Sequence, residues 1–409
     1  MPTRALGILA LAGALLHVPA ASSARELPLG SPSLDERRST VRVAPGVTWT
    51  RITRAGGPWR VHVLTVHRAL GGRVSGVLSN RRIEGRERSS AMARRARAVA
   101  GVNGGYFAVD GDPVGALAIG GRLLSEPVDG RSGLLVPVDP ALPARVASLS
   151  FAGAVASGSR ERLVDGVERL RGSIPACGGR GGDEPTERPN SALTCTDPSE
   201  LVVLSPRYGS NTRTSGGVEA VVRSGTVTAL ERAGNAAIPS DGVVLSGSAD
   251  AARFLTEAAP PGSRPEVRLG LLAGGRELPV AEQQLVVGGG PRLLVRGRIV
   301  VASRAEGFAP LEAPGFFGSF VASRNPRTLA GVRRDGRVLL VTIDGRRPGW
   351  SAGVTLPEAA RVMRSLGAHD ALNLDGGGST TMTVRGEVVN VPSDPTGERP
   401  VSDGVFVLP

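Results

Sequence analysis

Residues 371–383 read ALNLDGGGSTTMT: an apolar run, a carboxylate, three glycines and three hydroxyls. The apolar run predicts a buried strand, and a strand pattern resumes at Met382, so the polar residues stand at a strand end. Glycine permits close approach and positive φ, so the backbone N–H groups of such a loop can point at one anion. The stretch therefore predicts a ligand-binding loop. A turn that only reverses the chain is the alternative.

The common glycine-rich motifs do not fit this loop. No lysine follows the glycines, which excludes a P-loop, and the next residues, MTVRGEVVN, predict a hairpin rather than the helix of a dinucleotide site. Ser379 lacks the glycine two places later that the nucleophile turn of Ser hydrolases requires.

The loop and its surroundings resemble the phosphodiester glycosidase family. NLDGGGSTTM is preceded by DGR and a TLPEAARVM helix and followed by NVPSDPTGERPVSDG. VGGGPRLLVRG, NPRTLAGV and VNGGYF stand upstream in the family's order, so the resemblance covers most of residues 46–409. It implies hydrolysis of a sugar 1-phosphodiester, similar to an N-acetylglucosamine 1-phosphodiester, at the anomeric carbon, releasing free sugar and a phosphomonoester. The chain is then an enzyme of the glycosyl hydrolase class.

Carboxylates are expected at the anomeric centre. Asp375 is the first candidate and Asp344, at the end of a predicted strand, the second. The family also places a glutamate at Glu358. However, Thr355–Glu358 is a capping-box pattern, so the structural role of Glu358 ranks above a catalytic one. The sequence leaves open which carboxylate acts as base or nucleophile, and whether the reaction retains or inverts configuration.

Substrate-binding residues are expected around this centre. Arg327 and Arg399 can bind phosphate oxygens through two parallel hydrogen bonds, as can Arg346, whereas Arg347 is expected to be solvated. The backbone N–H groups of Gly376 to Gly378 would bind the same phosphate, and the resemblance assigns sugar hydroxyls to Asn103 and Tyr106. The full predicted set is Asn103, Tyr106, Arg327, Thr328, Asn373, Gly376, Gly377, Gly378, Ser379, Thr380 and Arg399.

No cofactor is expected. A divalent cation on Asp375 or Asp394 stays open, but no recognisable ligand spacing indicates one. His62 and His67 are interpreted as ordinary strand residues, because His369 is the only further histidine outside the N-terminal segment and a histidine metal site needs more partners.

Residues 1–24 predict a secretory signal peptide, with an arginine, a short apolar run and small residues before a cleavage site near Ala24. The protein is therefore expected outside the cytoplasm, without a membrane span. Residues 25–45 are interpreted as a linker and residues 46–409 as the phosphodiester glycosidase domain. Within it, residues 138–284 match the family motifs least and predict a β-rich middle region.

Composition indicates a globular protein of many short strands. There are 57 glycines and 31 prolines, only 3% of residues are aromatic, and 41% are hydrophobic. The predicted fold class is α+β, mainly antiparallel hairpins with a few helices, with the glycine loops converging on one cleft. The net charge of +12 comes from arginine alone. Because these arginines are scattered, a small or polymeric phosphoglycan is a better candidate partner than nucleic acid.

Cys177 and Cys195 lie within the middle region. In an exported protein, two cysteines at this separation predict one disulfide that closes a surface loop and stabilises the fold by about 3 kcal/mol. The alternative function is a non-catalytic module that holds an anionic cell-envelope glycan without cutting it. The sequence does not identify the sugar, the glycan or the oligomeric state.

Overall fold

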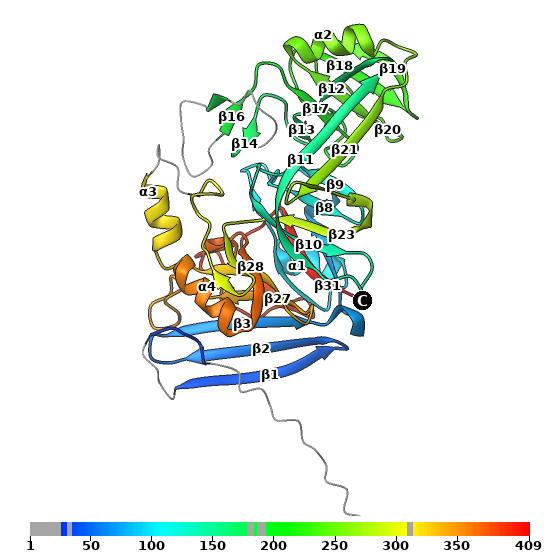
Figure 1. Ribbon diagram of the computed structural model, residues 1–409. Helices are drawn as coiled ribbons and strands as arrows, with labels where there is room; N and C mark the ends of the chain where they lie inside the picture. The colour runs from blue at the N-terminus through cyan, green and yellow to red at the C-terminus, as the bar shows by residue number, and fades with distance from the viewer. Residues whose placement is uncertain (1–25, 31–34, 178–183, 186–193, 309–313) are drawn as a thin grey trace, which may run out of the picture.

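The computed structural model describes residues 26–30, 35–177, 184–185, 194–308 and 314–409. The predicted signal peptide lies outside this part of the chain. Antiparallel sheets dominate and few helices accompany them (Figure 1), which confirms the expected α+β class.

An eight-stranded antiparallel sheet forms one end of the molecule. Its strands, in spatial order, are β1 (Glu36–Ala44), β2 (Val47–Arg54), β3 (Trp59–Val66), β27 (Val338–Ile343), β26 (Arg327–Arg333), β28 (Ala368–Asn373), β24 (Arg292–Val295) and β25 (Arg298–Ile299). The hairpin predicted around Gly56–Pro58 is β2 paired with β3, and the turn predicted at Asp335–Gly336 joins β26 to β27. Both predictions are confirmed.

Both faces of this sheet are buried. Val61 and Val63 of β3 pack with helix α4 (Leu356–Ser365), whereas Leu64 and Val66 of the same strand face the central core. The helix begins with the predicted capping box: Thr355 Oγ1 accepts from Glu358 N, and the Glu358 side chain accepts from Thr355 N.

The linker predicted for residues 25–45 is wrong for the described part of that segment. Residues 36–44 form edge strand β1, which pairs with β2 along most of its length. Leu27 and Leu29 are buried as well. The prediction failed because an edge strand can expose both faces, so its charged residues hide the strand pattern.

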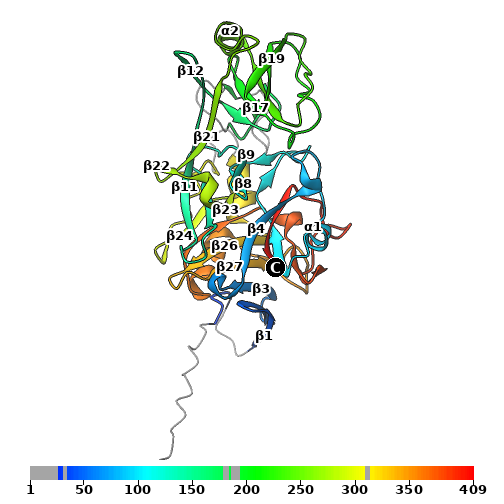
Figure 2. The same cartoon turned by 90° about the vertical axis from the view of Figure 1, so that its right-hand side faces the viewer.

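A second, seven-stranded sheet extends from the centre of the molecule, with one further strand paired to its longest member. Its strands, in spatial order, are β22 (Arg276–Leu278), β21 (Glu266–Ala273), β11 (Arg145–Ser157), β10 (Ser132–Pro137), β23 (Gln283–Gly288), β8 (Leu117–Ile119) and β9 (Arg122–Ser125), with β12 (Arg160–Leu163) beside β11. The long strands β11 and β21 run side by side toward the far end, as Figures 1 and 2 both show.

A third sheet with one helix occupies that far end. It consists of β13 (Gly166–Val167), β17 (Leu201–Leu204), β20 (Gly242–Gly247), β18 (Val218–Arg223) and β19 (Thr226–Glu231), with α2 (Ala249–Ala258) packed on it. Cys177 and Cys195 are bonded to each other, as predicted. Cys195 lies in a small sheet of β14 (Ile174–Pro175), β16 (Thr194–Thr196) and β15 (Glu184–Pro185).

A fourth sheet completes the centre. Its strands are β30 (Glu387–Val388), β29 (Met382–Val384), β5 (Ala100–Asn103), β31 (Asp403–Leu408) and β4 (Arg73–Leu78). Helix α1 (Ser89–Arg95) packs on it through Met92 and Ala93. The remaining elements are β6 (Tyr106–Phe107), β7 (Pro113–Val114), α3 (Pro314–Phe317) and the short helical turns η1 (Arg68–Leu70), η2 (Ser79–Arg81), η3 (Val280–Glu282), η4 (Gly318–Ala322) and η5 (Gly377–Ser379).

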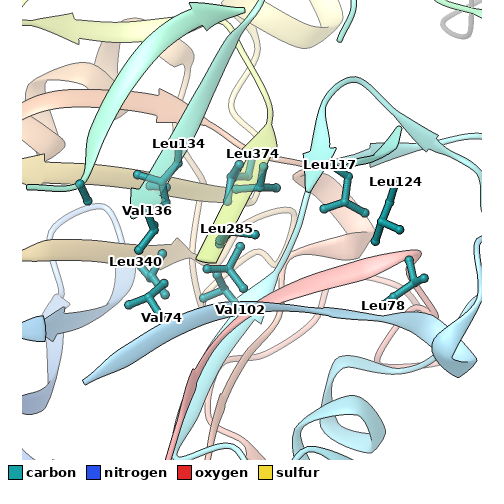
Figure 3. Close-up of a cluster of buried hydrophobic side chains, with 14 of the residues drawn as sticks. Val74, Leu78, Val102, Leu117, Leu124, Leu134, Val136, Leu285, Leu340 and Leu374 are labelled. Carbon is teal, nitrogen blue, oxygen red and sulfur yellow. The ribbon is translucent and has the colours of Figure 1, made fainter. Parts of the chain in front are cut away.

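One hydrophobic core joins these sheets. Figure 3 shows Val102, Leu285 and Leu374 in this cluster, together with Leu134 and Leu340. Val102 precedes Asn103, Leu285 precedes the glycines at 288–290, and Leu374 precedes Asp375. Burial of these three side chains in one core brings the ends of three separate strands together.

Candidate functional site

Three glycine-containing loops meet through hydrogen bonds: residues 103–106, 288–291 and 373–378. Asp375 N donates to Gly104 O at 3.2 Å, and Gly290 N donates to Asn373 O at 2.7 Å. The Tyr106 hydroxyl donates to Gly290 O at 2.6 Å. Loops that lie far apart in the sequence therefore form one continuous structure.

Each glycine of the run at 376–378 lies against a different arginine. The pairs are Gly376 with Arg327, Gly377 with Arg346 and Gly378 with Arg399. A Cβ on Gly378 would lie only 2.2 Å from Arg399 Nη2 and equally close to Asp394 Oδ1. Gly377 has φ of 59°, which disfavours other residues. Close approach thus requires glycine at 378, and backbone conformation favours it at 377.

Arg327 is buried and held by backbone carbonyls. Its Nε donates to Val354 O at 3.1 Å, and its Nη2 donates to Phe320 O at 2.5 Å. Burial lowers the pKa of Arg327 to about 10, so the guanidinium stays charged at neutral pH. Among the described residues, nothing bonds its Nη1.

Arg346 and Arg399 are held by side chains rather than by backbone carbonyls. Arg346 donates from Nε and Nη2 to Asn325 Oδ1, at 3.0 and 2.7 Å. Arg399 donates from the same two atoms to the Asp394 carboxylate, at 2.7 and 3.0 Å. Within the described part of the chain, Nη1 of each lacks a partner. All three arginines therefore keep donors for an anionic ligand, and phosphate oxygens match their geometry.

Asp375 follows the strand end directly, and its Oδ1 accepts from Gly376 N at 2.9 Å. Burial raises the pKa of Asp375 to about 6, against the opposite effects of the Ser379 hydroxyl and Arg399. The carboxyl therefore titrates near neutral pH, where acid–base catalysis needs such groups.

Asp403 is a second buried carboxyl that the sequence analysis missed. Its Oδ1 accepts from Gly105 N at 3.3 Å and its Oδ2 from the Ser402 hydroxyl at 2.6 Å. Burial raises its pKa, and its charge contributes to the raised pKa of Asp375. Asp403 stands at the start of β31 and before a glycine, within the quoted stretch NVPSDPTGERPVSDG. That signal could have identified it.

Asn103 and Thr328 hold the loops rather than presenting groups to a ligand. Asn103 Nδ2 donates to Asp375 O at 2.7 Å, and its Oδ1 accepts from Thr328 Oγ1 and from Thr381 N. Both side chains are fully buried. One Nδ2 hydrogen and the Oδ1 of Asn103 are thus bonded within the fold, and its expected contact with a sugar hydroxyl stays a prediction.

Tyr106 and Asn373 form a bonded pair. Asn373 Nδ2 donates to the Tyr106 hydroxyl at 2.7 Å, and that hydroxyl in turn donates to Gly290 O. The buried Asn373 Oδ1 has no hydrogen-bond partner among the described residues. A buried acceptor without a donor is costly, so this oxygen is a candidate ligand contact.

The predicted phosphate-binding amides are only partly available. Gly376 N donates to Asp375 Oδ1, and Gly377 N donates to Pro326 O at 2.9 Å. Their expected role is wrong because both N–H groups are bonded within the fold. Within the described chain, Gly378 N has no hydrogen-bond partner outside its own helical turn. Nearby, the buried Thr380 and Thr381 hydroxyls also lack partners there.

Asp344 is fully buried and fully engaged. Its carboxylate accepts from Trp350 Nε1 at 2.9 Å, from Asn390 Nδ2 at 3.1 Å and from Val391 N at 3.2 Å. Burial raises the pKa of Asp344, although these hydrogen bonds act in the opposite direction. Asn390 Nδ2 also donates to Thr380 O, so Asp344 is connected to the glycine loop through Asn390. This geometry favours a positioning role over the predicted catalytic one.

Glu358 caps helix α4, which is the structural role that the sequence analysis ranked above a catalytic one. Besides capping α4, it accepts two hydrogen bonds from Arg324, at 2.7 and 3.2 Å. Burial alone would raise the pKa of Glu358, but the Arg324 guanidinium and Thr355 lower it. Among the described residues, the Glu358 side chain bonds only to Arg324 and Thr355 and not to the glycine run.

Arg347 is not the solvated side chain that the sequence suggested, because its Nε and Nη2 donate to Pro392 O at 3.1 and 2.8 Å. Over the described ranges, no group of three or more His, Cys, Asp or Glu residues is placed to hold a metal ion. Within the same ranges, the helices are too short or too polar to cross a bilayer.

Comparison with known proteins shows what these residues are similar to. The model of the phosphodiester glycosidase family matches residues 216–408, which contain Asp375, Asp403 and all three arginines. The mouse N-acetylglucosamine-1-phosphodiester alpha-N-acetylglucosaminidase is 38% identical over 80 residues, 20% of this chain. The chain spans only 15% of that protein's length.

Solved structures extend the likeness to nearly the whole chain. A protein of Burkholderia pseudomallei K96243 described as exported has a TM-score of 0.84 and 29% identity, over 94% of this chain and 98% of that one. A hypothetical protein from Synechocystis has a TM-score of 0.71 at 22% identity, over 91% of this chain and 63% of that one, and shows the same fold. Together with the motifs, the family match makes residues 216–408 similar to the phosphodiester glycosidase family.

Proposed function

We propose that this protein hydrolyses a sugar 1-phosphodiester, similar to an N-acetylglucosamine 1-phosphodiester, at the anomeric carbon. Water adds to the anomeric carbon, the bond to the phosphate oxygen breaks, and the products are free sugar and a phosphomonoester. The observation that carries this proposal is the placement of three arginines and two coupled carboxyls around one glycine run.

The leaving group explains why arginines suit this site. A phosphomonoester has a second pKa near 6, so it departs with less help from an acid than a sugar hydroxyl needs. The free Nη1 donors of Arg327, Arg346 and Arg399 would hold its oxygens and stabilise the charge that develops on them. Asp394 keeps Arg399 in position through two hydrogen bonds.

The two carboxyls suit the sugar side of the reaction. An ionised Asp375 would stabilise the positive charge that develops at the anomeric carbon. Asp403 would accept or supply the proton that moves with the attacking water. Burial raises the pKa of Asp403, which favours a role in proton transfer. In this assignment, Asp403 replaces Asp344 as the second carboxyl, and the loops form the walls of the substrate cleft.

An extracytoplasmic location belongs to the same proposal. The Cys177–Cys195 disulfide supports it, because such bonds persist in oxidising compartments. The likeness to a bacterial protein described as exported points in the same direction.

The test is turnover of a panel of sugar 1-phosphodiesters, with free reducing sugar and phosphomonoester measured separately. We expect stoichiometric release of both products for at least one sugar, and loss of release in Asp375→Asn. A wild-type protein that binds an anionic cell-envelope glycan but releases neither product would instead be a glycan-binding module.

A further inference from the structure

Four aromatic rings gather beside the glycine loops, in a chain with only 8 phenylalanines, 2 tyrosines and 3 tryptophans. The ring centroid of Phe320 lies 5.4 Å from that of Phe308 and 5.1 Å from that of Phe316, with interplanar angles of 15° and 9°. Tyr106 lies 6.3 Å from Phe320 in an edge-on orientation. The ring planes of the three phenylalanines are thus nearly parallel.

The cluster runs from the interior to the surface. Phe308 is buried, whereas Phe316 and Phe320 are partly exposed and Phe317 is 39% exposed. The last three residues come from α3 and the turn η4 that follows it. Phe320 also packs against a core cluster, whereas Phe316 and Phe317 leave an apolar surface toward solvent.

Two contacts tie this surface to the candidate site. Arg327 donates to Phe320 O, and its guanidinium carbon lies 5.3 Å from the centre of the Phe320 ring. Tyr106, which touches Phe308 and Phe320, bonds through its hydroxyl to Gly290 and Asn373. The rings therefore adjoin both the arginines and the glycine loops.

We propose that Phe316, supported by the Phe320 ring beneath it, forms the sugar-binding surface of this site, on which the pyranose ring of the substrate stacks. This inference rests on the proposed function for the identity of its ligand. A pyranose presents C–H groups on its faces, and these pack against the electron-rich face of an aromatic ring. The same ring face disfavours anions. The phosphate is thereby directed to the arginines and the uncharged ring to the phenylalanines.

The variants that test this are Phe316→Ala and Phe320→Leu, with Phe317→Ala as the matched control. Phe317 belongs to the same segment and is exposed, but no ring contact joins it to the cluster among the described residues. Phe316 is the primary position, since Phe320 also packs against Arg327. Thermal melting identifies any variant that fails to fold.

Binding of methyl α-N-acetylglucosaminide, methyl α-glucoside and methyl α-mannoside is measured by saturation-transfer NMR, and binding of inorganic phosphate by calorimetry. We expect wild type to bind at least one pyranoside, and Phe316→Ala to bind it at least tenfold more weakly with phosphate affinity unchanged. Phe317→Ala should stay within twofold of wild type for both ligands.

Three results would overturn the inference: wild type binds no pyranoside, Phe316→Ala binds it as wild type does, or Phe317→Ala loses as much affinity as Phe316→Ala. Binding of wild type to phosphatidylcholine vesicles, with no pyranoside bound, would assign the rings to a lipid surface instead. Pyranoside binding through Phe316 without hydrolysis of any sugar 1-phosphodiester contradicts the proposed reaction alone. Hydrolysis that Phe316→Ala leaves unchanged contradicts the sugar surface alone.

Discussion

Asp375 and Asp403 are joined through a single residue, Gly104. Asp375 N donates to Gly104 O at 3.2 Å, and Gly104 N donates to Asp403 O at 3.0 Å. A Cβ on Gly104 would lie 1.7 Å from Asp403 Oδ1, so glycine is required there. The two carboxyls are thereby held close enough for the charge of Asp403 to raise the pKa of Asp375.

Asp375→Asn should lower hydrolysis of a sugar 1-phosphodiester by at least ~100-fold, which corresponds to about 2.7 kcal/mol of transition-state stabilisation. Asparagine keeps the size and can still accept the bond from Gly376 N, so the fold and phosphate binding should survive. Steady-state kinetics and thermal melting measure the two effects.

Glu358→Gln is the control for that variant. Glutamine can still close the capping box with Thr355, so activity should stay close to wild type. Full activity of Asp375→Asn together with an inactive Glu358→Gln would mean that the catalytic carboxyl has been assigned to the wrong residue.

The pH profile should show an acidic limb near pH 6. Burial raises the pKa of Asp375 to about 6, and the ionised form is the one that would stabilise the anomeric carbon. Activity should therefore rise as pH increases through about 6. The stability contribution has the opposite sign: a pKa raised from 3.8 favours the folded state at low pH, and that contribution is lost as pH rises through 6.

Asp403→Asn should move this limb to lower pH. Removing a neighbouring negative charge favours ionisation of Asp375, because the charge of Asp403 contributes to its raised pKa. Because Asp403 is also the proposed proton carrier, the rate should fall as well, and the profile of the remaining kcat/KM against pH measures the shift. A limb that stays in place would show that Asp403 has no influence on the titrating group.

Gly378→Ala should weaken phosphate binding more than tenfold. The added Cβ would lie 2.2 Å from both Arg399 Nη2 and Asp394 Oδ1, so the ion pair must move. Gly209→Ala is the control, because the nearest atom outside its own chain neighbours would be 3.9 Å away. Calorimetry with inorganic phosphate compares the two variants, and equal affinities would exclude Arg399 from the phosphate site.

Arg399→Lys should reduce turnover at least tenfold with little change in melting temperature. Lysine keeps the positive charge beside Asp394. However, it has a single nitrogen, so it cannot bind Asp394 as the guanidinium does and still offer further N–H donors to phosphate. The pair is partly exposed, so it contributes about 1 kcal/mol or less to stability. Arg364→Lys, at an exposed position on α4, should have no effect on turnover. Equal losses of turnover in Arg399→Lys and Arg364→Lys would mean that the effect does not depend on the position of the arginine.

Local chemistry in the sequence was sufficient for several elements. The Asp335–Gly336 hairpin, the Thr355–Glu358 capping box and the pairing of Cys177 with Cys195 all follow from residues close in sequence or from the count of one residue type. The position of Asp375 at a strand end follows from apolar periodicity. Each of these features depends on short-range geometry, which a single chain segment determines.

The side-chain partners were decided only by tertiary structure. Asn103 and Asp344 are both polar residues at strand ends, like Asp375, yet the packing of distant strands surrounds each of them with donors or acceptors. Asp403 lies beside Gly104 only because β31 pairs with β5, and Phe320 lies beside Arg327 only because distant segments pack against one core cluster. The sequence by itself determined which residues could do the chemistry. Burial of strands far apart in the chain determined which of those residues still have groups free for a substrate.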